Sequence, residues 1–202
     1  VGCYPEFCKI GLIEDCYSNP GDVCTAPKPG SNKDGFRWNT PAENIIIRRC
    51  VMKDGHGGVV IGSEISGGCR NVWAEDCEMD SPNLDRVVRL KTNPLRGGTI
   101  ENLFVRNIRV GECKESVMRV ELKYERVTEG PNMPLIRHIV LSNIHSNKSK
   151  YGVWIDGYTD RINVHDVLIR NCSFSNAEKG NLIVGAENVV FEDCLLNGEK
   201  IE

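Results

Sequence analysis

The segment Arg70-Asn-Val-Trp-Ala-Glu-Asp-Cys77 decides the fold, because the chain repeats its pattern along its whole length. Each copy begins with a polar residue and continues with apolar residues at alternate positions. It then closes on Cys or Ile, in most copies after an Asn or Asp. The other six copies occupy residues 9–16, 43–50, 101–108, 137–144, 165–172 and 187–194. Seven copies of one pattern indicate a repeat architecture.

The alternation and the spacing together predict how each copy folds. Apolar residues at every second position are typical of a half-buried strand, and no sustained helical period is present. The closing residues, from Cys16 to Cys194, lie 34, 27, 31, 36, 28 and 22 positions apart. A unit of this length suits one coil of a right-handed parallel β-helix, in which equivalent side chains stack from coil to coil. We therefore expect one all-β solenoid domain over residues 1–202, with long loops at 20–41 and 123–134.

Ten cysteines in 202 residues admit two interpretations. They either form a disulfide framework or act as small apolar side chains in the interior. The sequence contains no Cys-x-x-Cys pair, and five of the cysteines close repeat copies, which favours an internal ladder. Zinc-ribbon and thioredoxin-like sites are excluded by the same spacing.

Composition narrows the possible functions. The net charge of −3 lacks the basic excess of a dedicated nucleic-acid binder. No apolar run approaches the roughly 18 residues of a membrane span. Hydrophobic residues make up 40% of the chain, enough for a globular core.

Three short motifs interrupt the repeat in its first half. They are Gly21-Asp22, Gly55-His56-Gly57 and Arg89-Leu90-Lys91. Each has an ordinary structural interpretation, namely a turn aspartate, a loop histidine and a solvated charged pair. Their separations of 34 and 33 residues are about one coil, so we expect them to stack on one face. A carboxyl group, an imidazole and two cations there suit acid-catalysed cleavage of an anionic sugar.

At these motifs the chain resembles the polygalacturonases, glycoside hydrolase family twenty-eight, especially their bacterial branch. Gly55-His56-Gly57 matches the family's Gly-His-Gly, and Arg89-Leu90-Lys91 matches its Arg-Ile-Lys with a conservative change. The resemblance implies a right-handed parallel β-helix and inverting hydrolysis of α-1,4-galacturonosyl bonds in pectin. It assigns Asp22 and His56 to catalysis and Arg89 and Lys91 to substrate binding, with no metal or organic cofactor. It also implies a secreted or periplasmic protein, expected here to be monomeric, whose partner is a pectic oligo- or polysaccharide.

Two departures from the family pattern stand out. Val23 occupies the place of the second carboxylate in the family's Gly-Asp-Asp, and the family's Asn-Thr-Asp counts back to about Val1. Inverting hydrolysis requires an acid and a base roughly 6.5–9.5 Å apart. We therefore expect the chain to be the C-terminal part of a longer glycoside hydrolase, or a degenerate copy of one.

Two alternatives remain open beside a hydrolase. One is a non-catalytic carbohydrate-binding β-helix derived from that family, and the other is a structural β-helix without a ligand. A pectate lyase is disfavoured, because the sequence has no acidic cluster suited to its calcium ion.

Overall fold

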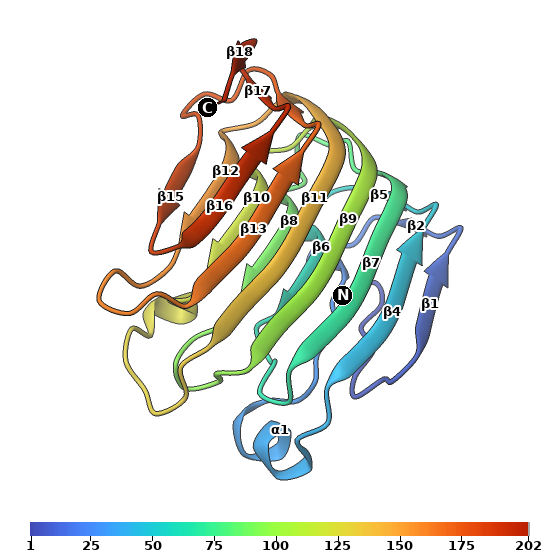
Figure 1. Ribbon diagram of the computed structural model, residues 1–202. Coiled ribbons are helices and arrows are strands. Elements are labelled where there is room, and N and C mark those ends of the chain that lie inside the picture. Colours follow the sequence, from blue (N-terminus) through green and yellow to red (C-terminus); the bar gives the residue numbers. More distant parts are fainter. Residues whose placement is uncertain (202) are drawn as a thin grey trace.

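In a computed structural model, which describes residues 1–201, the chain forms the right-handed parallel β-helix expected from the repeat (Figure 1). A six-stranded sheet consists of β3 (Val23–Thr25), β6 (Gly57–Gly62), β8 (Arg86–Lys91), β10 (Ser116–Glu121), β12 (Tyr151–Asp156) and β15 (Leu182–Val184).

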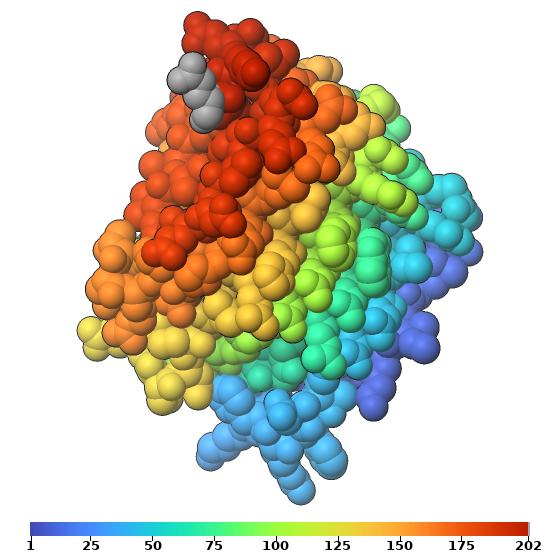
Figure 2. Space-filling view, in the orientation of Figure 1, coloured from blue at the N-terminus to red at the C-terminus, as the bar shows by residue number. Residues whose placement is uncertain are grey.

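A twelve-stranded sheet forms the opposite wall. Its strands are β1 (Gly11–Glu14), β2 (Tyr17–Ser18), β4 (Ala42–Arg48), β5 (Val51–Met52), β7 (Cys69–Glu78), β9 (Thr99–Glu112), β11 (Leu135–Lys148), β13 (Val164–Arg170), β14 (Ser173–Phe174), β16 (Glu187–Glu192), β17 (Leu195–Leu196) and β18 (Glu199–Lys200). The pairings are parallel except for that of β17 with β18. Successive coils appear as parallel bands across this wall (Figure 2).

The interior consists of apolar ladders that run along the axis. One ladder pairs Ile45 with Val72, Leu103, Ile139 and Val167 in successive strands, and each of these side chains is buried. Complete burial of such a side chain contributes roughly 1.5–3 kcal/mol. Because every coil repeats the same inward positions, the alternating pattern of the sequence becomes one continuous core.

Backbone conformation explains the polar residues of the motif. Asn71 and Asp76, both within β7, have φ angles of 56° and 55°. The equivalent Asn102 and Asn107 of β9 have φ angles of 56° and 54°. Asn and Asp adopt this left-handed region more readily than other residues with a side chain. These residues therefore bend each strand at the same two points, and the repeat retains them for that reason.

The cysteines are free thiols, which overturns the disulfide interpretation. Cys77 stacks on Ile108, and Ile108 stacks on Ile144, as the internal ladder requires. Burial raises the pKa of Cys77 and Cys172 to about 12, so both remain protonated. Cys16, in the first coil, is exposed.

The two expected loops are only partly loops. Residues 20–41 contain β3 and a short helix α1 (Asn32–Trp38), which projects from the solenoid (Figure 1). Asn39 ends this helix in the left-handed conformation, and its N–H donates to the carbonyl of Gly35. Residues 123–134 contain one 3-10 turn, η1 (Tyr124–Arg126). Within residues 1–201, no helix has the length and apolarity to cross a membrane.

Candidate active site

The candidate site lies on the outer face of the six-stranded sheet. Along β8 the side chains alternate, so Leu90 enters the core while Arg89 and Lys91 lie on the outer face. The turns before β3 and β6 carry Asp22 and His56 to the edge where the strands begin. All four predicted residues thus belong to three consecutive coils.

Asp22 and His56 lie side by side. Val23 pairs with Gly57 in the parallel register, and the backbone N–H of His56 donates to the carbonyl of Asp22. Gly55 makes this approach possible, because its φ is 85° and a Cβ there would overlap the Asp22 carbonyl. Both side chains are about half exposed, at 54% for Asp22 and 56% for His56. A ligand on this face can therefore reach both.

The prediction that Arg89 stacks beside His56, made from their 33-residue spacing, is wrong. The register places Arg89 beside Val60, because the coil that joins these strands is 29 residues long. The residue beside His56 is Asp85, whose carboxylate Oδ2 lies 2.8 Å from the imidazole Nδ1. Arg89 and Lys91 lie three and five residues beyond the first residue of β8 and so further across the sheet.

Asp85 is held from several directions and is only 17% exposed. Arg86 Nη1 lies 3.4 Å from its Oδ2, and Lys114 Nζ from the next coil lies 3.8 Å from its Oδ1. Its backbone N–H also donates to the carbonyl of Gly55, at 2.8 Å. Because the carboxylate is fixed in place, it in turn fixes the orientation of the His56 ring.

Arg89 is buried and already partnered. Its Nη2 donates to Glu121 Oε2 at 2.8 Å, whereas its Nε is buried without a hydrogen-bond partner. Glu121 belongs to β10, one coil further along the axis, and pairs with Lys91 in the register. Arg89 is therefore a partly satisfied cation beneath the surface.

Lys91 is the more available cation. The ion pairs of the described residues leave it without a carboxylate partner, and its Nζ lies 4.6 Å from the ring centre of Tyr124. Burial, and then the nearby charge of Arg89, lower the pKa of Lys91 to about 8. A desolvated ammonium beside an aromatic ring is suited to bind an anion.

A second charged pair borders Lys91. Lys28 Nζ lies 3.3 Å from Glu64 Oε2. Burial favours the neutral form of Glu64, but hydrogen bonding from its own backbone N–H and the charge of Lys28 outweigh burial and lower its pKa. Glu64 therefore remains ionised and contributes one negative charge to the rim of the site.

Val23 is buried and offers no polar group to the candidate site. It is 3% exposed and packs with Ala26 and Val60 in a small apolar cluster on the outer face. The position at which the family pattern has its second aspartate is thus closed by hydrocarbon.

Three residues of this site do not appear among the sequence predictions as site residues. Glu121 had a visible signal, because Arg119-Val120-Glu121 repeats Arg89-Leu90-Lys91 one coil later. Tyr124 lies 33 residues after Lys91, about one coil, but within a stretch interpreted as a loop. The contact of Asp85 with His56 depends on the register between coils, which the sequence does not show directly.

Several other polar and aromatic side chains of the solenoid have structural partners. Lys53 pairs with Glu78 at 2.9 Å, and Asp54 accepts a hydrogen bond from Ser81. Trp154 covers the guanidinium of Arg119 at 3.7 Å, and the ring of Tyr151 lies 4.6 Å from that of Trp154. Tyr158 donates its hydroxyl to the carbonyl of Leu122. Within residues 1–201, no group of three or more His, Cys, Asp or Glu is placed to hold a metal ion.

The chain matches the model of the glycosyl hydrolases family 28 over residues 8–187, and it belongs to that family. It is 35% identical over 114 residues to a probable polygalacturonase of Vitis vinifera, covering 56% of this chain and 23% of the relative. It is 26% identical over 144 residues to a polygalacturonase of Ralstonia nicotianae, covering 70% and 25% respectively.

Two solved structures share the architecture. A hyperthermoactive exopolygalacturonase from Thermotoga maritima superposes with a TM-score of 0.92 at 34% identity, covering 98% of this chain and 44% of that one. A family 28 exopolygalacturonase from Yersinia enterocolitica gives a TM-score of 0.73 at 19% identity, covering 98% and 36%, and supports the fold alone. The chain spans less than half the length of each of these four relatives.

Proposed function

We propose that this protein is a polygalacturonase-like hydrolase that cleaves α-1,4-galacturonosyl bonds in pectic polysaccharide. Asp22 is the general acid, His56 supports it, and Lys91 together with Arg89 binds a uronate carboxylate. The observation that carries the proposal is the stacking of Asp22 on His56 at the edge of a face that also carries Lys91, which has no ion-pair partner within residues 1–201. Membership in family 28 supports the same assignment.

The geometry suits proton donation by Asp22. Its half-exposed carboxyl group stands on the open face, where it can reach a glycosidic oxygen. A positioned acid of this kind contributes roughly 10²–10⁴-fold to a reaction rate. The adjacent imidazole is oriented by Asp85, which accepts a hydrogen bond from Nδ1 and leaves Nε2 directed away from that contact.

Substrate binding rests mainly on Lys91. The ammonium and the ring of Tyr124 form a cationic and aromatic surface on the outer face. A uronate ring offers a carboxylate to the ammonium and C–H groups to the aromatic ring. Arg89 supports this surface from below, because it neutralises Glu121 and so keeps that carboxylate from competing with the substrate.

Asp22 supplies the acid, but Val23 stands at the position of the family's second aspartate and cannot act as a base. The base must therefore be another residue. Val23 is hydrocarbon and is buried against Ala26 and Val60. This observation favours a second candidate function, a β-helix that binds pectic chains without cleaving them. Turnover by the full-length protein decides between the two.

We infer a secreted or periplasmic location, because the proposed substrate is a polymer outside the cell. The interior thiols are compatible with such a location, because burial raises the pKa of Cys77, Cys113 and Cys172 to about 12. A buried, protonated thiol resists oxidation, so these side chains persist in an oxidising compartment.

Release of reducing sugar from polygalacturonate by the full-length protein tests the proposal. Asp22→Asn is expected to lower kcat by about 10²–10⁴-fold with little change in KM, because the amide cannot protonate the leaving oxygen. Binding of oligogalacturonate without turnover by the wild-type protein would establish the binding module instead. Absence of both binding and turnover would contradict both functions.

Asp85 gives a second test, as a positioning residue for His56. Asp85→Asn is expected to lower kcat by about 10–100-fold at unchanged KM and to alter the pH–rate profile, because the amide no longer enforces one imidazole tautomer. Lys114→Ala is the matched control, since it removes another contact of Asp85 and leaves the hydrogen bond to His56 intact. Equal kinetics for Asp85→Asn and the wild type would exclude this role.

A further inference from the structure

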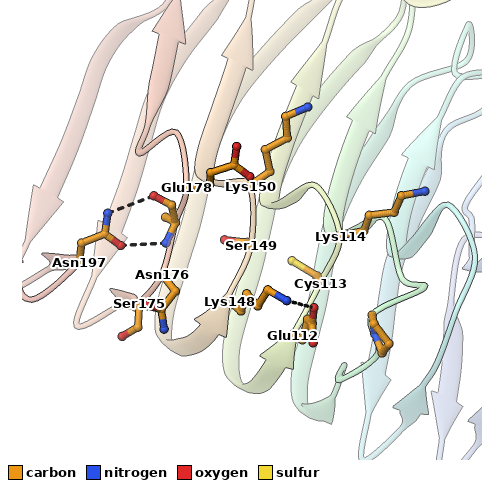
Figure 3. A pocket seen from close by; sticks show the side chains of 12 residues that line it. Glu112, Cys113, Lys114, Lys148, Ser149, Lys150, Ser175, Asn176, Glu178 and Asn197 are labelled. Carbon is orange, nitrogen blue, oxygen red and sulfur yellow. Dashed lines mark hydrogen bonds and ion pairs between the residues drawn. The ribbon is translucent and has the colours of Figure 1, made fainter.

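A groove of about 1010 Å³ lies outside the candidate site, where the turns pass from the twelve-stranded to the six-stranded sheet. Five successive coils line it, through Pro82, residues 112–114, 148–150 and 175–178, and Asn197 (Figure 3). Its walls come from repeated turns of the solenoid and thus from the rigid part of the fold.

Three ammonium groups give the groove its chemistry. Lys148 lies on Glu112 at 2.8 Å, and Lys114 is 3.8 Å from Asp85. Lys150 has no ion-pair partner among the described residues, and Figure 3 shows it extending in the same direction as Lys114 from the neighbouring coil. Glu112 and Glu178 also line the groove, so its three lysines and two glutamates leave a single net positive charge, and Lys150 is the lysine without an ion-pair partner among the described residues.

Neutral polar groups accompany these lysines. Ser149 lines the groove and is 4% exposed, and its hydroxyl is buried without a hydrogen-bond partner. Asn176 donates its amide to the carbonyl of Asn147, which leaves the side-chain oxygen available as an acceptor. A buried hydroxyl without a hydrogen-bond partner is destabilising, so a ligand oxygen that reached Ser149 would remove that cost. Cations, a hydroxyl and an amide oxygen together match a ligand with both carboxylates and hydroxyl groups.

The groove begins where the candidate site ends. Asp85, which orients His56, also contacts Lys114, and the turns of Lys114 and Lys150 follow it on the next two coils. Parallel strands are spaced about 4.8 Å apart, so these lysines stand about 5 and 10 Å beyond Asp85 along the axis. A polymer at His56 that ran along this edge would enter the groove within a few sugar units.

We propose that this groove binds uronate units of the same polymer at a distance from the bond that is cleaved, with Lys150 holding a uronate carboxylate and Ser149 a sugar oxygen. The inference rests on the proposed function for the identity of the polymer. The groove gives long oligomers additional affinity and leaves short oligomers, which fill only the candidate site, unaffected.

Binding measurements by calorimetry test the groove, with the full-length protein carrying Asp22→Asn so that the ligand persists. Adding Lys150→Glu is expected to raise the Kd of a galacturonate octamer about 10-fold, because it places a like charge against the uronate. Lys150→Gln is expected to give a smaller increase in the same direction. The Kd of a galacturonate dimer remains unchanged in both variants.

Two controls separate this groove from general electrostatics. Lys33→Glu, on α1, makes the same change of charge at an exposed site elsewhere and is expected to leave the octamer Kd unchanged. A methyl-esterified octamer lacks the carboxylates, and its Kd is expected to be the same with and without Lys150→Glu.

The outcomes distinguish this inference from the proposed function. An octamer Kd that Lys150→Glu leaves unchanged, or changes only as much as Lys33→Glu does, overturns the groove. If the wild-type protein still hydrolyses polygalacturonate in that case, the proposed function stands. If Lys150→Glu weakens octamer binding while the wild-type protein hydrolyses no polygalacturonate, the groove stands as a binding site and the hydrolase proposal fails.

Discussion

The outer faces of the two sheets are built from the same coils but treat their polar groups in opposite ways. On the twelve-stranded sheet, charges of opposite sign stack in register and neutralise one another. On the six-stranded sheet, the described part of the chain offers Lys91 no ion-pair partner and the buried Nε of Arg89 no hydrogen bond. The polar groups of the twelve-stranded sheet are paired with one another, whereas the six-stranded sheet leaves polar groups available to a ligand.

Particular pairs illustrate how the polar groups of the twelve-stranded sheet bind one another. Arg70 donates to Glu43 at 2.6 Å, and Arg137 donates to Glu101 at 2.8 Å in later coils. The amide of Asn102 donates to Asn71 at 3.0 Å. Such ladders arise because a repeated position meets its own equivalent in the next coil. A functional face must depart from that repetition, and the departures on the six-stranded sheet are the residues of the candidate site.

Among the substitutions that test this comparison between the faces, Lys91→Met has the largest expected effect. We expect Lys91→Met in the full-length protein to lower kcat/KM for polygalacturonate on the order of 100-fold, equivalent to about 2.7 kcal/mol. Arg106→Met, an equally outward change on the twelve-stranded sheet, is expected to alter kcat/KM less than about 2-fold, because Arg106 only serves its ladder partner Glu75. Similar losses in both variants would break the comparison between the faces.

The pH dependence of Lys91 is a sharper and smaller effect. Its pKa of about 8 implies that affinity for oligogalacturonate falls by up to tenfold per pH unit above pH 8, as the ammonium loses its proton. Lys91→Arg retains its charge and is expected to bind nearly independently of pH between 8 and 9.5. A titration by calorimetry in which both proteins lose affinity in parallel would contradict the assignment.

Lys91 also makes the free energy of unfolding depend on pH, and this contribution rises with pH where the ligand affinity falls. Because the pKa of Lys91 is lower in the folded protein than its ordinary 10.5, the unfolded chain binds more protons between pH 8 and 10.5. The contribution of Lys91 to the free energy of unfolding therefore rises with pH in that window. Denaturant unfolding of the wild type and Lys91→Met across this range isolates the contribution.

The smallest effect concerns the twelve-stranded face. Asn102→Ala removes a ladder hydrogen bond and forces alanine to a φ of 56°, so we expect a loss of about 1–2 kcal/mol in the free energy of unfolding. Asn102→Gly removes the same hydrogen bond without the backbone strain and is expected to cost less. Thermal unfolding distinguishes the two, at roughly 2–4 °C per kcal/mol for a chain of this size. Equal stability of the alanine and glycine variants would show that the bend does not require Asn.

Much of the fold could be predicted from the repeat alone. The alternation in residues 70–77 placed Val72 and Ala74 in the interior, and both are buried. The interpretation of cysteine as an interior residue is confirmed at Cys77 and Cys172. These predictions succeed because burial of a repeated position depends only on local alternation and on the existence of a next coil.

The site was less accessible to such reasoning. The spacing of Asp22 and His56 agrees with their stacking, because the coil between them is 34 residues long, as the Val23–Gly57 pairing requires. The next coil is shorter, so Asp85 rather than Arg89 stands beside His56. Coil length varies with the turns, and a difference of a few residues changes which side chains meet.

The sequence by itself determined the solenoid, the inward ladders and the kinds of residue that could act on an anionic sugar. Only the tertiary structure decided that Asp85 orients His56 and that Glu121 forms an ion pair with Arg89. It also decided that Lys91 has no ion-pair partner within residues 1–201 and that Lys150 lines a groove. The physical reason is that alternation and backbone preference are local properties that a sequence carries directly. Pairing between coils depends on register, and register depends on the length of every turn in the folded protein.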